Sequence, residues 1–166
     1  MTRMEGAKLK TLIVYKSLHR KNTEKIARAM AEATGARIAR VEEVQPEELA
    51  EYDLIGLGSG IYNDNFARCI FNLIEEIPES KLVFLFWTAA VLREAHPKIV
   101  REKLLEKGCR IVGEFACPGE FVPLGLNLGR ELPSVLVVLS GKNKGQPDEG
   151  NLEKARTFVR DMVDRR

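Results

Sequence analysis

The chain has 166 residues, which fits one domain able to bury roughly two-thirds of the surface of its unfolded form. Its 26 basic and 24 acidic residues are interspersed and leave a net charge of +2, which excludes a basic stripe of the kind that binds nucleic acid. No apolar run has the length of a signal peptide or a membrane span, so we expect a cytoplasmic protein.

Short apolar runs without alternation predict strands that are covered on both faces. In chain order these runs are residues 12–15, 54–57, 82–87, 111–116 and 135–139. Between them, apolar residues recur at helical spacing over 26–31, 66–77, 99–105 and 152–162. A short strand at 37–41 and a brief helix at 46–49 complete an alternation that predicts a doubly wound parallel sheet in a single domain, residues 1–166.

One segment interrupts this alternation. Residues 118–133 contain three prolines and three glycines, so neither a strand nor a helix can run through them. An irregular stretch of this length is usually functional in a compact domain, and we expect a lid or a partner surface there.

The cysteines and histidines do not predict a metal site. Cys69, Cys109 and Cys117 are an odd number, lack metal-ligand spacing and lie in apolar surroundings, so we expect reduced, buried thiols. His19 and His96 have no carboxylate or cysteine companions at ligand spacing.

The segment Ser17–Thr23 joins the first predicted strand directly to an amphipathic helix. The end of the strand and the start of the helix expose backbone N–H groups, and the helix dipole is positive there. Ser17, Asn22 and Thr23 add side-chain donors. This junction therefore predicts a binding site for an anion such as a phosphate.

Two further turns belong to the same site, because ligands of doubly wound sheets bind outside the carboxyl ends of the strands. After the third strand, Gly58–Asn63 carries one aromatic residue, Tyr62, among small ones; after the fourth, Thr88–Ala90 is small and uncharged. Together with Ser17–Thr23, these turns predict a slot for a flat aromatic ligand with a phosphate tail.

Other functions of this architecture need residues that the turns lack. A phosphoacceptor receiver domain needs acidic residues where Ser17 and Gly58-Ser59 stand. A Walker phosphate loop is absent, and Gly56–Ile61 lacks the third glycine of a dinucleotide fingerprint. Ser59 is not in a Gly-x-Ser-x-Gly elbow, which argues against a hydrolase.

The Ser-x-x-x-x-Asn-Thr pattern of Ser17–Thr23, followed by Lys25-Ile26-Ala27, resembles the phosphate loop of the flavodoxin family, whose members bind FMN. Gly58–Tyr62 is similar to the second flavin loop of that family, and Asn143–Pro147 resembles a stretch of its less-studied microbial members. The resemblance spans nearly the whole chain. It implies a flavodoxin-like fold, with a five-stranded parallel sheet in the order 2-1-3-4-5 and helices on both faces.

The resemblance also implies which residues bind FMN. In the phosphate loop they are Ser17, Leu18, His19, Arg20, Lys21, Asn22 and Thr23. Beside the isoalloxazine ring they are Ser59, Gly60, Ile61, Tyr62, Asn63, Thr88, Ala89 and Ala90. Tyr62 takes the position of an aromatic residue that stacks on the ring in the family; the alternative is that it packs on the helix predicted at 66–77.

Two residues depart from the family pattern. Lys21 stands where many members have glycine, which gives up easy access to a positive φ but places a charge beside the phosphate. Asn63 stands where typical flavodoxins have a glycine whose peptide turns over toward flavin N5 on one-electron reduction. Asparagine tolerates left-handed conformations, so this movement is allowed but less free.

The resemblance implies non-covalent FMN binding and electron transfer without a catalytic side chain. Ala89, Ala90 and Leu92 stand in the third loop instead of acidic residues, so we expect the flavin to be easier to reduce fully than in acidic relatives. The partner would be a redox protein or a small flat acceptor. Two alternatives remain open: an FMN-dependent oxidoreductase resembling quinone reductases or protoporphyrinogen oxidase, and an interaction module without flavin. A monomer and a homodimer are equally compatible with the sequence.

Overall fold

A computed structural model describes residues 8–18, 20–120 and 141–164. The strands are β1 (Thr11–Lys16), β2 (Arg37–Arg40), β3 (Leu54–Tyr62), β4 (Asn65–Phe66), β5 (Leu82–Ala89) and β6 (Arg110–Pro118). The helices are α1 (Asn22–Thr34), α2 (Arg68–Glu76), α3 (Lys98–Glu106) and α5 (Glu149–Val163), with 3-10 helices η1 (Val41–Glu43) and η2 (Pro46–Glu51). These bounds confirm the predicted alternation within the described residues.

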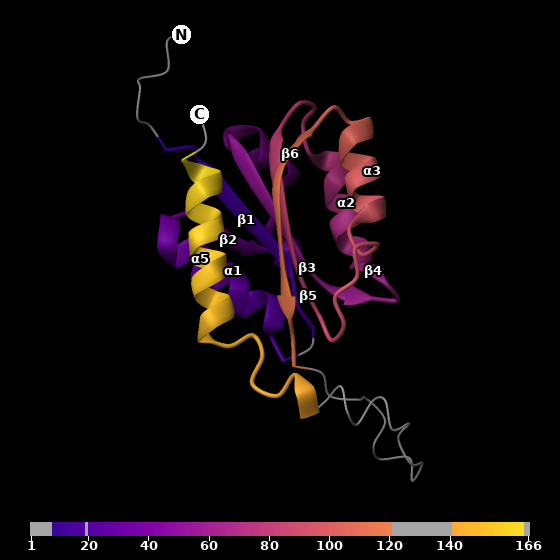
Figure 1. Cartoon of the computed structure of the whole chain (residues 1–166). Helices are drawn as coiled ribbons and strands as arrows, with labels where there is room; N and C mark the ends of the chain where they lie inside the picture. Colours follow the sequence, from indigo (N-terminus) through magenta and orange to yellow (C-terminus); the bar gives the residue numbers. More distant parts are fainter. Residues whose placement is uncertain (1–7, 19, 121–140, 165–166) are drawn as a thin grey trace.

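The sheet has the order β2-β1-β3-β5-β6, and each of these pairings is parallel. Counted among the five parallel strands, this is the predicted order 2-1-3-4-5. Helices α1 and α5 cover one face and α2 and α3 cover the other (Figure 1). Each face has its own apolar core, one containing Val14 and Ile70, the other Ile13 and Val159. Successive residues of β1 therefore point into different cores, which explains why its sequence is apolar without alternation.

Strand β3 depends on two glycines to pack beside β5. A Cβ atom on Gly56 would lie 2.2 Å from Cζ of Phe84, and one on Gly58 would lie 2.1 Å from Cζ of Phe86. The two phenyl rings of β5 therefore lie across the backbone of β3, in space that a side chain would otherwise fill.

The turn predicted at 58–63 is wrong in its bounds. Strand β3 continues to Tyr62 and forms a hairpin with β4, pairing Ile61 with Phe66 and Tyr62 with Asn65. The turn itself is Asn63-Asp64, with φ of 51° and 60°. Two consecutive left-handed residues match the tight hairpin turn that suits the twist of antiparallel strands. Because Phe66 belongs to β4, the second helix begins at Arg68 instead of Phe66.

Some expectations lie outside the described residues. The strand predicted at 135–139 lies entirely outside them. Of the interrupting segment 118–133, only the first three residues are described, and the first of these, Pro118, ends β6. Of the cysteines, Cys109 and Cys117 are buried as predicted, whereas Cys69 is half-buried. Burial raises the pKa of Cys117 to about 12 and also raises the pKa of Cys69, so both thiols keep their protons at neutral pH.

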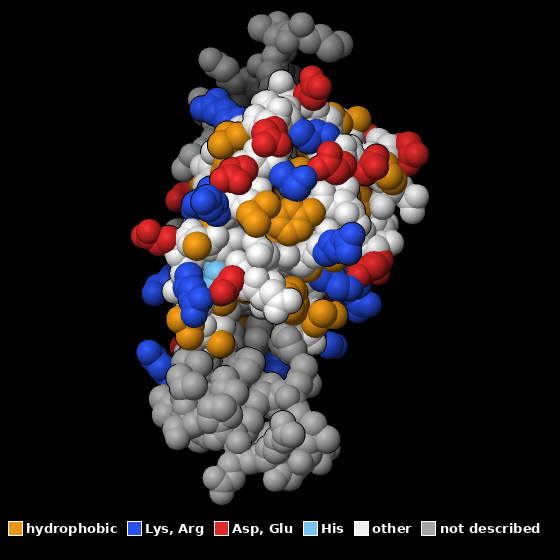
Figure 2. All heavy atoms as spheres, turned by 90° about the vertical axis from the view of Figure 1, so that its right-hand side faces the viewer, with side chains coloured by type: hydrophobic (Ala, Val, Ile, Leu, Met, Phe, Trp, Pro, Cys, Tyr) orange, Lys and Arg blue, Asp and Glu red, His pale blue; other side chains and the backbone are white. Residues whose placement is uncertain are grey.

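Figure 2 shows the face covered by α2 and α3, where a small group of apolar side chains lies among Lys, Arg, Asp and Glu side chains of both signs. The two helices are also joined by an ion pair, between Lys103 of α3 and Glu75 of α2 at 3.1 Å. The mixture of signs agrees with the expectation, from the sequence, that no basic stripe is present on this face. Among the described residues, no helix combines the length and the apolarity needed to cross a bilayer.

Candidate functional site

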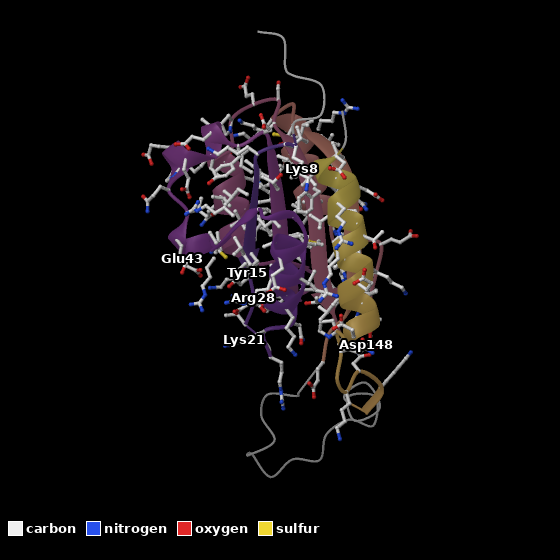
Figure 3. The ribbon with its side chains drawn as sticks, turned by 90° about the vertical axis from the view of Figure 1, so that its left-hand side faces the viewer. Lys8, Tyr15, Lys21, Arg28, Glu43 and Asp148 are labelled. Atoms are coloured by element: carbon white, nitrogen blue, oxygen red, sulfur yellow. The ribbon has the colours of Figure 1, made fainter. Side chains whose placement is uncertain are left out.

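The candidate site lies at the carboxyl ends of the parallel strands. All five point toward the same end of the molecule (Figure 1). Lys21, just before α1, and Asp148, just before α5, both lie at this end, whereas Lys8 lies at the opposite one (Figure 3). The starts of two helices and the ends of the strands therefore meet here, as the position of ligand sites in such sheets requires.

A cavity of about 140 Å³ opens between the predicted turns. It is lined by Ser17, Asn22, Thr23, Gly60, Ile61, Tyr62, Thr88, Ala89, Ala90, Gly119 and Glu120. Nine of these eleven residues belong to the predicted set. Gly119 and Glu120 were missed because the sequence placed them inside the interrupting segment. Their position follows from β6, since the Gly119 N–H donates to the Ala89 carbonyl at 3.0 Å and continues the strand pairing.

The two residues before α1 have an unusual backbone conformation, and the first turn of this helix has features that suit an anion. Arg20 and Lys21 both adopt left-handed conformations, with φ of 47° and 55°. No side chain caps the first turn of α1 within the described residues, so its N–H groups, which have no acceptor inside the helix, are directed toward the loop. Unpaired donors at the positive end of a helix favour a bound anion.

Lys21 adopts a left-handed conformation, which is unfavourable for a residue other than glycine. A left-handed conformation costs a residue other than glycine about 1–2 kcal/mol. Glycine avoids this cost, but part of the gain is offset because glycine loses more conformational entropy on folding. We therefore expect Lys21→Gly to raise the free energy of unfolding of the ligand-free protein by about 0.5–1 kcal/mol. Lys21→Ala removes the same charge but keeps the strain, so thermal unfolding should show no gain for that variant. Equal stability of the two variants would contradict this explanation.

Asn22 connects α1 to the chain after β6. Its side chain is buried, and Nδ2 donates to the Glu120 carbonyl at 2.9 Å. The other amide atom, Oδ1, is buried without a hydrogen-bond partner among the described residues. A Cβ atom on Gly119 would lie 2.6 Å from Nδ2, so the glycine allows this close approach. Because an unpaired buried acceptor costs free energy, Oδ1 is suited to a ligand that brings a hydroxyl or N–H donor.

Thr23, in the first turn of α1, contacts Thr88, which belongs to β5 although the sequence analysis placed it in a turn after that strand. Its Oγ1 lies 2.8 Å from Oγ1 of Thr88, and both side chains are buried. The carboxyl end of β5 is thereby fixed against the first turn of α1. Asn143, which the sequence analysis did not single out as a site residue, supports the residue that follows β5, because its buried Nδ2 donates to the Ala90 carbonyl at 2.6 Å.

Tyr62 forms one wall of the cavity and reaches across to the first turn. A Cβ atom on Gly60 would lie 2.7 Å from the Tyr62 hydroxyl, so the ring covers the glycine. The hydroxyl accepts a hydrogen bond from the Leu18 N–H at 3.1 Å, and the side chain also packs against the core on the α2 side. Burial raises the pKa of Tyr62, so the phenol is neutral at physiological pH.

The remaining predicted residues that the structure describes do not line this cavity. Ser59 is fully buried; its hydroxyl donates to the Gly60 carbonyl at 2.5 Å and accepts from the Ala67 N–H at 2.9 Å. Leu18 and Lys21 line a separate hollow of about 420 Å³ between the first turn and η1. Asn63 lies in the hairpin turn, Arg20 is exposed in the loop before α1, and His19 lies outside the described residues.

These residues fit a phosphorylated ligand with a flat ring. The first turn of α1 offers unpaired N–H groups, and Asn22 Oδ1 offers an acceptor for a hydroxyl of a polyol chain. A volume of about 140 Å³ is below the roughly 300–1,000 Å³ of pockets that enclose whole ligands. The cavity therefore suits the phosphate and part of the chain, and a flat ring would extend past Tyr62 toward solvent.

A parallel sheet with helices on both faces and a cavity at the carboxyl ends of its strands places this chain in the class of doubly wound α/β proteins. A family model for the flavodoxin domain matches residues 12–120. An uncharacterized protein of Methanocaldococcus jannaschii is 37% identical over 158 residues, covering 93% of this chain and 99% of that protein. The chain therefore belongs to the flavodoxin family.

Solved structures show the same fold at low identity. A flavodoxin from the domain Archaea is 17% identical with a TM-score of 0.64, covering 93% of this chain and 96% of its own. Oxidised flavodoxin 2 from Bacillus cereus is 23% identical with a TM-score of 0.61, covering 90% of this chain and 94% of its own. These likenesses confirm the predicted flavodoxin-like fold.

Proposed function

We propose that the chain binds FMN without a covalent bond, in the cavity at the strand ends, and transfers electrons. The observation that carries this proposal is the combination at one place of uncapped N–H groups, the unpaired Oδ1 of Asn22 and the aromatic wall of Tyr62. Membership of the flavodoxin family supports the identity of the cofactor, and the Bacillus cereus neighbour is described as an oxidised flavodoxin.

Each part of the cavity has a task in this proposal. The first turn of α1, with the hydroxyl of Thr23, holds the phosphate, and Asn22 Oδ1 accepts a hydrogen bond from the ribityl chain. Tyr62 and the residues Thr88–Ala90 at the carboxyl end of β5 position the isoalloxazine ring. When bound, FMN supplies the electron chemistry, and the protein contributes binding, orientation and electrostatics.

The charges around the cavity favour a flavin that is readily reduced. Glu120 is the only charged residue among those described as lining it, and Ala89 and Ala90 carry no charge. Fewer negative charges near the ring repel added electrons less, so the reduced flavin is less disfavoured than beside an acidic loop.

A visible absorption spectrum of the untreated purified protein, followed by stepwise anaerobic reduction, tests the proposal. We expect flavin absorption, or its appearance after FMN is added, and reversible bleaching on reduction. A protein that is colourless and takes up no added FMN would contradict both FMN binding and electron transfer, and would leave the interaction module. Turnover of NAD(P)H and a quinone without a separate reductase would favour the oxidoreductase instead of the carrier.

A further inference from the structure

A cluster of charged and titratable side chains joins two loops beside the cavity. Asp64 lies in the hairpin turn after β3. Nη1 of Arg93 donates to both oxygens of its carboxylate, at 3.0 Å to Oδ1 and 3.2 Å to Oδ2. Nε2 of His96 lies 3.5 Å from Oδ1 of the same carboxylate. Arg93 and His96 both belong to the loop between β5 and α3, so the carboxylate of one loop binds two groups of the other.

The two joined loops continue two walls of the cavity. Tyr62, which lines it, immediately precedes the hairpin turn, and Ala89 and Ala90, which also line it, precede the loop that carries Arg93 and His96. None of the three clustered residues lines the cavity itself. Their effect on a ligand is therefore indirect, through the position of the two walls.

The surroundings of His96 favour one tautomer of its neutral ring. Only 2% of its side chain is exposed, and its Nδ1 accepts a hydrogen bond from the Arg93 N–H at 3.4 Å. A nitrogen that accepts carries no hydrogen, so the neutral ring has its proton on Nε2, the atom that faces Asp64. A second proton on Nδ1 would point at the Arg93 N–H and break that contact.

The backbone of the hairpin turn needs such support. Both Asn63 and Asp64 have left-handed conformations, and Asp64 occupies the second position, where glycine is preferred. Strained residues persist where surrounding contacts hold them. The carboxylate of Asp64, bound to Arg93 and facing His96, provides that restraint.

We propose that Asp64, Arg93 and His96 are positioning residues that form a latch while His96 is neutral. This latch joins the hairpin turn to the loop after β5 and holds the Tyr62 wall of the cavity against the Ala89–Ala90 wall. The effect on flavin binding rests on the proposed function; the latch itself does not.

The latch has a defined pH dependence. Burial lowers the pKa of His96 below its ordinary value of 6.5; Asp64 opposes this shift, and Arg93 adds to it. These two are the charged groups that act on His96 from the elements packed around it, among the residues described. Just below pH 6.5 the folded state binds fewer protons than the unfolded state. The contribution of neutral His96 to the free energy of unfolding is therefore complete above pH 6.5 and is lost as the pH falls below this value.

Nitrogen NMR of the imidazole rings in the full chain tests the latch without any ligand. The chain has two histidines, so a His19→Gln variant assigns the signals of His96. We expect a neutral ring with hydrogen on Nε2 and a titration midpoint below 6.5, which Asp64→Asn lowers further because it removes the carboxylate that opposes the shift. A midpoint at or above 6.5, or no response to Asp64→Asn, would overturn the proposal.

Binding titrations with FMN and riboflavin test the effect on the cavity. Asp64→Asn and Arg93→Gln should weaken the binding of both flavins by the same factor, because the latch acts on the cavity walls beside the ring and not on the phosphate. The factor should be about two- to fivefold, because exposed ion pairs have small effects. The loss in the wild type should appear as the pH falls through the His96 midpoint, and Arg93→Lys should restore part of the affinity. Lys103→Gln, which breaks an exposed ion pair with Glu75 on the other helices, is the matched control and should change neither affinity.

The possible failures are distinguishable. Unchanged affinity of the Asp64 and Arg93 variants for both flavins would overturn the positioning role while leaving FMN binding intact. A wild type that binds neither flavin would refute the proposed function, and the NMR titration would still decide whether the latch exists.

Discussion

Thr23→Val is expected to weaken FMN binding roughly 10- to 150-fold, the equivalent of the 1.5–3 kcal/mol that a charge-assisted hydrogen bond contributes. Thr23 is buried in the first turn of α1 and lines the cavity where the phosphate is proposed to lie. Valine keeps the shape of the side chain and removes only its hydroxyl. Isothermal titration of the apoprotein with FMN measures the loss.

Thr88→Val is the matched control. The hydroxyls of Thr23 and Thr88 form a single hydrogen bond of 2.8 Å, so either substitution breaks that contact and leaves one buried hydroxyl without its partner. A contact of Thr23 with the phosphate appears only in the difference between the two variants. Riboflavin, which lacks the phosphate, should lose little more affinity for Thr23→Val than for Thr88→Val. If both variants lost the same affinity for FMN, the Thr23 hydroxyl would not contact the phosphate.

Gly58→Ala is expected to lower the free energy of unfolding by about 2–3 kcal/mol, within the range found for overpacked cores. The new methyl group would lie 2.1 Å from Cζ and 2.2 Å from Cε2 of Phe86, a side chain that is fully buried. Neither the ring nor the backbone of β3 can move without disturbing the sheet between two cores. For a chain of this size, the melting temperature should fall by roughly 5–10 °C.

Gly141→Ala controls for the general effect of replacing glycine. Apart from its chain neighbours, no atom of the described residues lies within 4 Å of a Cβ built on Gly141, so we expect the free energy of unfolding of this variant to stay within about 0.5 kcal/mol of the wild type. Combining Gly58→Ala with Phe86→Leu provides a second check, because a smaller side chain makes room for the methyl group. The double variant should lose less than the sum of the two single losses. Simple additivity would show that the ring is not what makes the glycine necessary.

The periodicity of the sequence was sufficient to predict the parallel sheet. Unalternated apolar runs reveal strands buried on both faces, and the described strands β1, β3, β5 and β6 contain the runs assigned to them. The hairpin after β3 was not predictable in the same way. Gly58 and Gly60 looked like turn residues, whereas each of them leaves room for an aromatic ring, Phe86 and Tyr62 respectively. A sequence does not show whether a glycine serves to bend the chain or to make space.

The composition of the candidate site was readable where its residues follow a strand directly. Ser17, Asn22 and Thr23 could be chosen because a strand–helix junction exposes donors by its geometry alone. Glu120 and Asn143 could not be chosen, since they reach the cavity or its support through contacts with Asn22 and Ala90, 98 and 53 residues away in sequence. The partner of His96 was hidden for the same reason.

By itself, the sequence determined the class of fold and the order of its parallel strands, and it predicted the location of the candidate site, because these follow from local periodicity and from chemistry at the end of one strand. The tertiary structure alone decided which side chains meet. It placed Thr23 against Thr88, Tyr62 over Gly60, and Asp64 beside Arg93 and His96. The Thr23–Thr88 contact and the cluster of Asp64, Arg93 and His96 join segments that follow or end different strands, and their geometry depends on the register of the sheet, which no local pattern encodes.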